Sequence, residues 1–124
     1  MKIIKYHWQL DVYKLAVDAA MEIFECTKSF PKEDQIRRSS RSVSAQIAEA
    51  WRRRKYEAVF VNKLNESEGE AAETQGWLEY AVKCGYLNRN KGRQIHRTYD
   101  RILGKLVTMG NNPQRWVLAK STDF

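Results

Sequence analysis

The stretch YEAVFVNKLNESEGEAAETQGWLEYAVKCG, residues 56–85, decides the fold class. Its apolar and small residues recur in steps of three and four, the spacing that places side chains on one face of an α-helix. These positions are Tyr56, Phe60, Leu64, Ser67, Ala71, Thr74, Leu78 and Ala81. Gly85 supplies a residue that readily adopts the left-handed conformation of a C-terminal cap, so Tyr86 and Leu87 should pack back against the helix end. The stretch therefore predicts one long amphipathic helix.

Two segments before this stretch show the same helical spacing. In the first, the apolar positions are Trp8, Val12, Leu15, Ala16, Ala19, Ala20, Ile23 and Phe24. This helix should end near Lys28, because the residue before Pro31 is disfavoured from helical geometry. A second helix should start at Pro31 and Asp34, with its carboxylate near the positive end of the helix dipole. Its face is formed by Ile36, Ser40, Val43, Ile47 and Ala50, and Trp51 closes it.

A last helix is predicted after residue 87, with Asn88 or Asn90 as its N-cap and Gly110 as its end. Its apolar face consists of Ile95, Tyr99, Ile102, Leu103, Leu106 and Met109. Short connections between successive helices favour antiparallel neighbours. We therefore predict an all-α protein, an antiparallel up-down-up-down four-helix bundle over residues 1–110 with a C-terminal tail over 111–124. Trp116 favours docking of that tail on the bundle.

Composition agrees with one globular helical domain. The chain has 124 residues, of which 43% are apolar and 30% charged, with only 2 prolines and 6 glycines. This length is that of a single domain and suffices for a full core. No apolar run is long enough to cross a bilayer, and no secretory signal follows Met1, so we expect a cytoplasmic protein. The 2 cysteines, Cys26 and Cys84, are expected to be small buried hydrophobic residues.

The positive charge is concentrated in two of the helices. The chain carries 22 Lys and Arg against 15 Asp and Glu, a net charge of +7, which suits a polyanionic partner or simply maintains solubility. Residues 35–55 hold seven basic and one acidic residue, and residues 85–105 hold six and one. Residues 56–80 hold one basic and six acidic residues. Helices two and four are therefore basic, and helix three is acidic.

The basic residues define the candidate nucleic-acid site. The candidates are Arg37, Arg38, Arg41, Arg52, Arg53, Arg54, Lys55, Arg93, Arg97 and Arg101. The run 52–55 is either a turn or a continuous helix, and the flanking Trp51 and Tyr56 could stack on unpaired bases; the alternative is a solvated helix junction with Trp51 buried. The last three arginines recur every four residues and form one row on a helix. That row could follow phosphates or pair with the acidic helix, within the bundle or across a subunit contact.

Residues for catalysis are missing from the sequence. A di-metal site in a four-helix bundle needs Glu-x-x-His pairs, but the only histidines, His7 and His96, do not lie three residues after a Glu. Glu66, Glu70 and Glu73 share a face of the third helix, which without histidine predicts a solvated or ion-paired face. The sequence contains no nucleotide-binding loop, nucleophile elbow or HExxH motif. We therefore expect no enzyme, no cofactor and no metal.

Several stretches together resemble one protein family. Residues 8–16, WQLDVYKLA, resemble the opening "L-x-V-W-x-x-A" of the 23S rRNA-intervening-sequence proteins, also called four-helix bundle proteins. The resemblance continues through 30–33 and 35–40, and is clearest at 42–50, SVSAQIAEA, which is similar to "S-[VI]-P-[AS]-N-I-A-E-G". Residues 84–87, CGYL, resemble "L-G-Y-[LI]". The match covers 8–106. Ser44 and Ala50 replace the family's proline and glycine, so the second helix should be straighter and run on through Trp51.

The resemblance implies an up-down four-helix bundle that assembles into a ring-shaped homopentamer. It also implies kinship with the accessory proteins of diversity-generating retroelements, which are basic pentamers that bind nucleic acid and a reverse transcriptase. The family name describes a gene location inside rRNA insertions and no activity. Residues and resemblance together predict a non-enzymatic basic oligomer that binds structured RNA or another nucleic acid. The alternative is a protein–protein interaction scaffold whose charged helices serve ring assembly and docking of a protein partner.

Overall fold

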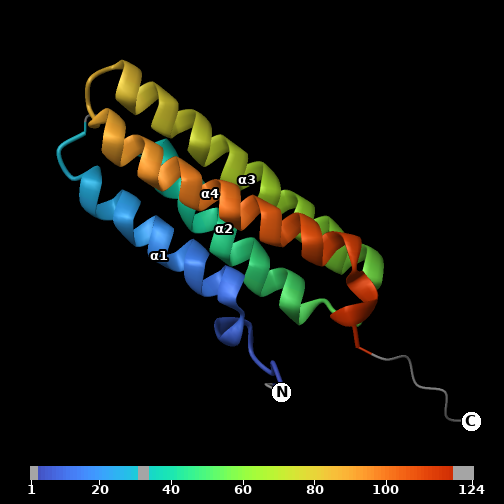
Figure 1. Cartoon of the computed structure of the whole chain (residues 1–124). Helices are drawn as coiled ribbons and strands as arrows, with labels where there is room; N and C mark the ends of the chain where they lie inside the picture. Colours follow the sequence, from blue (N-terminus) through green and yellow to red (C-terminus); the bar gives the residue numbers. More distant parts are fainter. Residues whose placement is uncertain (1–2, 31–33, 119–124) are drawn as a thin grey trace, which may run out of the picture.

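The computed structural model describes residues 3–30 and 34–118, and this part of the chain contains four α-helices and no strand. The helices are α1 (Asp11–Cys26), α2 (Asp34–Arg52), α3 (Glu57–Lys83) and α4 (Arg89–Asn111). Short 3-10 turns precede and follow them, η1 (His7–Gln9) and η2 (Pro113–Arg115). Successive helices run in opposite directions, each packs on the next along the chain, and α4 returns to pack on α1 (Figure 1). The predicted all-α class and the four helices are confirmed.

The core is built from the stripes that the helical spacing predicts. On α3 every predicted position after Tyr56 is buried, from Phe60 to Ala81, and on α4 the stripe from Ile95 to Met109 is buried except for the half-buried Leu103. Each fully buried Leu or Ile contributes about 1.5–3 kcal/mol relative to an exposed position. Among the residues that the structure describes, no helix is long and apolar enough to cross a membrane.

The predicted start of the first helix is wrong. Leu10 has an extended backbone and is the N-cap of α1, so the helix begins at Asp11, and His7–Gln9 form a separate 3-10 turn. The Gln9 side chain holds this turn by accepting hydrogen bonds from the backbone N–H groups of residues 5 and 6, at 2.8 and 2.9 Å. As a result Trp8 is 54% exposed, and Leu10 occupies the core instead. Phe24, also predicted on the buried stripe, is exposed.

Helix α2 runs on through Trp51 to Arg52, as the replacements at 44 and 50 predict. It packs closely on α3 because small residues face each other across the contact. The Ser67 hydroxyl donates to the Val43 carbonyl at 2.8 Å, and the Thr74 hydroxyl donates to Ser39 Oγ at 2.8 Å. Asp34 is the first residue of α2, whereas Pro31 lies outside the described residues.

The helix ends follow the predicted capping residues closely. Gly85 has φ +78°, the left-handed conformation that favours glycine. The sequence predicts that both Tyr86 and Leu87 pack back against the helix end. Leu87 is buried, but Tyr86 is 51% exposed, so only Leu87 joins the core. Asn88 is the N-cap of α4, and its side chain accepts from the backbone N–H of Asn90 at 2.8 Å. Helix α4 continues one residue past Gly110.

Both cysteines are free, but neither is fully buried. Cys26 is half-buried and Cys84 is exposed at the end of α3, which corrects the expectation of two buried thiols. Burial raises the pKa of the Cys26 thiol, so this group is less reactive than an ordinary cysteine at neutral pH.

The described part of the tail packs on the bundle. The rings of Trp116 and Trp51 lie 6.2 Å apart, edge to face. The Leu118 backbone N–H donates to the Arg54 carbonyl at 3.1 Å. Residues 119–124 lie outside the described residues.

Candidate nucleic-acid interface

Arg53 to Lys55 form a turn directly after the end of α2, so the basic run 52–55 is not a continuous helix. Helix α2 ends at Arg52, the next three residues turn the chain, and Tyr56 is the N-cap of α3. The Arg53 N–H still bonds to carbonyls of α2, at 3.0 and 3.1 Å, and the Tyr56 N–H bonds to the Arg53 carbonyl at 2.9 Å. The basic run is thus a short, hydrogen-bonded connection at one end of the bundle.

The buried side chain of Trp51 holds this turn on the bundle. Its indole N–H donates to the Lys5 carbonyl at 3.0 Å. The Arg54 guanidinium lies over the Trp51 ring, and burial lowers the pKa of this arginine. Trp51 is therefore not available to stack on a base, and Arg54 serves the structure of the turn.

The other basic residues of the turn face solvent. Arg52, Arg53 and Lys55 are exposed, and none has an ion-pair partner among residues 3–30 and 34–118. Tyr56 is 56% exposed, with the Lys55 ammonium 5.8 Å from its ring centroid. Cations and an exposed aromatic ring thus lie together, the combination that contacts phosphates and unpaired bases.

A second aromatic element lies at the same end, and the sequence interpretation missed it. Tyr6 and Trp8 stack in parallel with ring centroids 4.4 Å apart, and both are more than 40% exposed. Figure 1 shows that the N-terminal segment, the turn after α2 and the segment after α4 lie at the same end of the bundle. The aromatic cluster Tyr6, His7 and Trp8 beside Lys5 is the signal in the sequence, but the helical spacing places Trp8 on the buried stripe instead.

Two predicted candidates on α2 are engaged within the chain. Arg37 Nε donates to Thr27 Oγ1 at 2.9 Å, and its guanidinium lies 4.5 Å from the Phe24 ring centroid. Arg38 forms ion pairs with Glu70 and Glu73 of α3. Both arginines therefore stabilise helix packing. Arg41, by contrast, is exposed beside a groove between α1 and α2.

The arginine row of α4 lies on the outer face of the bundle. Arg93, Arg97 and Arg101 are exposed, and within the described chain no ion pair links them to α3. The α3 carboxylates interact instead with Arg38, with Lys63 on α3 itself and with His96 of α4. Pairing of the row with α3 inside the bundle is thus not observed. Arg93 lies near the start of α4, and this helix starts at the end of the bundle opposite the basic turn (Figure 1).

The ten predicted residues therefore do not form one surface. The structure brings together Arg52, Arg53 and Lys55, assigns Arg37, Arg38 and Arg54 to packing, and separates the α4 row. In the described ranges, no group of three or more His, Cys, Asp or Glu side chains is arranged to hold a metal ion.

Comparison with known proteins identifies the family of this chain. No curated protein sequence matches it. A solved structure from Bacteroides thetaiotaomicron, described as a protein with unknown function from the S23 ribosomal protein family, is 30% identical with a TM-score of 0.74. The similarity covers 81% of this chain and 95% of that one. Residues 8–108 match the sequence profile of the family described as 23S rRNA-intervening sequence protein. The chain therefore belongs to the 23S rRNA-intervening sequence protein family.

Proposed function

We propose that this protein binds nucleic acid without catalysing a reaction, through the basic end of the bundle. This surface, the basic end, comprises Arg52, Arg53, Lys55, Tyr56 and the stacked pair Tyr6–Trp8. The observation that carries the proposal is that the three cations of the turn are exposed and without ion-pair partners in the described chain, beside exposed aromatic rings. Unpaired cations of this kind can contact phosphates without first breaking an internal ion pair.

Structured RNA is the nucleic acid that this surface fits best. Arginine makes bidentate contacts to phosphate, and aromatic rings stack on bases that are free of a duplex. RNA with loops or bulges offers both features side by side. The turn is held by the buried Trp51 and its hydrogen bond to Lys5, so little ordering of the backbone is needed on binding.

We further propose that the protein acts as a homo-oligomer, a pentameric ring by its resemblance to the accessory proteins of diversity-generating retroelements. The subunits of a cyclic ring are related by symmetry, so the basic ends of all subunits lie in equivalent positions around the ring axis. Several basic ends could then contact one RNA, and linked contacts of this kind raise the overall affinity without any new type of contact.

The test is salt-titrated binding of labelled hairpin RNA, single-stranded RNA and duplex DNA to the whole chain. The variant Arg52→Glu/Arg53→Glu/Lys55→Glu should weaken hairpin binding more than about tenfold and make binding less salt-dependent, with a slope reduced by about 3. The matched control Arg93→Glu/Arg97→Glu/Arg101→Glu changes the net charge by the same amount. Sedimentation first checks that both variants assemble as the unchanged protein does. With assembly unchanged, equal loss in both variants would indicate only general attraction, and unchanged binding in the turn variant would reject the site.

A protein–protein interaction scaffold is the second candidate, and the arginine row of α4, which has no ion-pair partner within residues 3–30 and 34–118, favours it. Those guanidiniums could meet carboxylates of a neighbouring subunit or of a protein partner. Sedimentation of the pure protein at low and high salt separates the two roles. An assembly that dissociates in high salt supports charge-mediated contacts, whereas one that stays intact depends on apolar packing.

A further inference from the structure

A small hollow lies between the end of α3 and the beginning of α4, away from the basic end. Its volume is about 400 Å³, and its walls include the apolar side chains of Leu78 and Val82 together with Gly92. Gly92 has no side chain, and a Cβ there would lie 2.5 Å from Val82 Cγ2. The glycine thus lets Val82 of α3 pack directly against the backbone of α4 at the wall of the hollow. A volume of this size is in the range of small-molecule sites.

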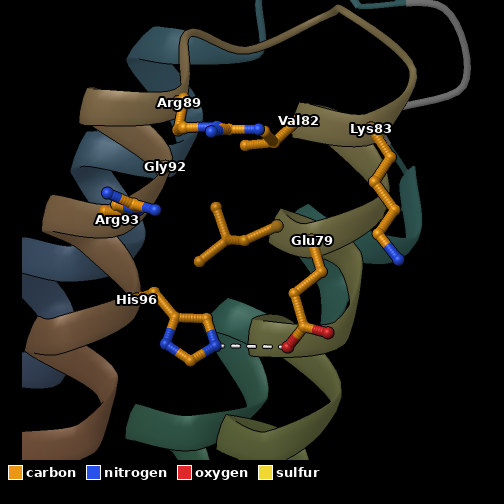
Figure 2. Close-up of a pocket in the computed structure, with 8 residues that line it drawn as sticks. Glu79, Val82, Lys83, Arg89, Gly92, Arg93 and His96 are labelled. Atoms are coloured by element: carbon orange, nitrogen blue, oxygen red, sulfur yellow. Dashed lines mark hydrogen bonds and ion pairs between the residues drawn. The ribbon is translucent and has the colours of Figure 1, made fainter.

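Polar side chains close the hollow at two opposite ends. Figure 2 shows the Arg89 side chain extending from α4 toward Val82 of α3 at one end. At the other end, His96 Nε2 is hydrogen-bonded to Glu79 Oε2 at 3.2 Å. The hollow is therefore an apolar space with a cationic group at one end and a hydrogen-bonded pair at the other.

The charge around the hollow is unbalanced. Lys83, Arg89 and Arg93 line it, and none of the three has an ion-pair partner in the part of the chain that the structure describes. The lining carboxylate, Glu79, is already engaged by His96. A complementary occupant has an apolar body, which would replace water against Leu78 and Val82, and an anionic group, which would be bound by the guanidiniums.

We propose that this hollow binds a small organic anion, an aliphatic or aromatic molecule that carries one carboxylate or phosphate group. The anionic group is bound by Arg89 and Arg93, and the apolar body lies along Val82. This site does not depend on nucleic-acid binding, because it shares neither Arg52, Arg53 nor Lys55 with the basic end.

The experiment titrates the full chain with octanoate and follows backbone amide signals by NMR. Gly92 lines the hollow, and its amide signal is a local reporter, while Gly69, Gly76, Gly104 and Gly110 lie elsewhere on the helices and serve as internal controls. Octanoate should shift the Gly92 signal saturably at sub-millimolar concentration. Octanol, which lacks the charge, and acetate, which lacks the apolar body, should each bind about tenfold or more weakly. Equal shifts with octanol or acetate, equal shifts at all glycines, or no shift with octanoate would overturn the proposal.

The variant Arg93→Glu should weaken octanoate binding by about tenfold, since it replaces an attractive charge by a repulsive one. Arg97→Glu is the matched control, because it makes the same charge change on the same exposed face one turn further along α4, outside the hollow. Its affinity for octanoate should stay within about twofold of the unchanged protein. Equal weakening in both variants would show that only the general positive field attracts the anion, and the site would be rejected.

Discussion

The guanidinium carbon of Arg54 lies 3.6 Å from the centroid of the Trp51 ring, and Arg54 Nε donates to the Trp51 carbonyl at 2.8 Å. The same two residues also bind the segments that precede α1 and follow α4. Trp51 donates to the Lys5 carbonyl, and the Arg54 carbonyl accepts from the backbone N–H of Leu118. One arginine in a run of basic residues thus holds the turn together, whereas its neighbours Arg53 and Lys55 are exposed.

Replacement of Arg54 by Ala is expected to lower the free energy of unfolding by about 1–2 kcal/mol, because it removes a cation–π contact and a hydrogen bond from a charged donor. Arg53→Ala, one position earlier and exposed, should change it by less than about 0.5 kcal/mol. Urea denaturation of both variants measures the difference. Equal stability of the two proteins would contradict the structural role of Arg54.

Gly92→Ala is expected to destabilise the bundle, although alanine is the better helix former. The new Cβ would lie 2.5 Å from Val82 Cγ2, and overpacking of this kind costs about 1–3 kcal/mol against a helix-propensity gain of about 1 kcal/mol. Gly104→Ala, in the same helix with no atom within 4 Å of its Cβ, should instead be stabilising. Urea denaturation compares them. The double variant Val82→Ala/Gly92→Ala should recover most of the loss, and a stabilised Gly92→Ala single variant would contradict the close contact.

Trp8→Ala is expected to weaken binding of single-stranded and hairpin RNA by about fivefold or more, since loss of a stacked base costs about 1–3 kcal/mol. Binding of duplex DNA should change little, because paired bases are not available for stacking. Fluorescence anisotropy with the three labelled nucleic acids measures these affinities. Val107→Ala, an exposed apolar residue on α4, is the control. An equal loss for duplex DNA would contradict the stacking role.

The helical core could be predicted from the sequence because residues at helical spacing lie on one face of a helix, and the apolar face of each helix is the one that is buried. Phe60 and Leu64 of α3 lie four residues apart, as do Ile102 and Leu106 of α4, and all four are fully buried. Trp8 fits the same spacing numerically, but the helix starts only after Leu10. A tryptophan just before a helix can match the spacing of the buried stripe and still face solvent. Spacing alone therefore does not decide whether such a residue is buried.

The candidate site was less predictable, because ion pairing depends on which helices become neighbours. Charge counts correctly place basic residues on α2 and α4, but they do not show that Arg38 pairs with α3 while Arg97 faces solvent. The distinction between Arg53 and Arg54 is also invisible in the sequence, since it depends on the position of the Trp51 ring. Composition therefore shows how much basic charge each helix carries, and the tertiary contacts determine which of these residues are engaged within the described chain.

Tyr99 provides the last prediction, because its side chain is fully buried and its hydroxyl has no hydrogen-bond partner among the residues that the structure describes. A buried polar group without a partner is costly, so Tyr99→Phe should leave stability unchanged at pH 7 or raise it by up to about 1–2 kcal/mol. Urea denaturation of the variant and the unchanged chain checks this. A loss of more than about 2 kcal/mol would indicate that the hydroxyl is hydrogen-bonded in solution.

The same variant isolates a pH effect at Tyr99. Burial, and secondly the charge of Glu22, raise the pKa of this hydroxyl above its ordinary value. The folded state therefore holds the proton more tightly than the unfolded state, and stability falls as the pH rises above the unfolded-state pKa of about 10. Tyr99→Phe has no proton to lose at this position, so its advantage over the unchanged protein should grow between pH 9 and about pH 11. Denaturation curves at both pH values measure the difference, and a constant difference would mean that Tyr99 ionises equally well in the folded protein.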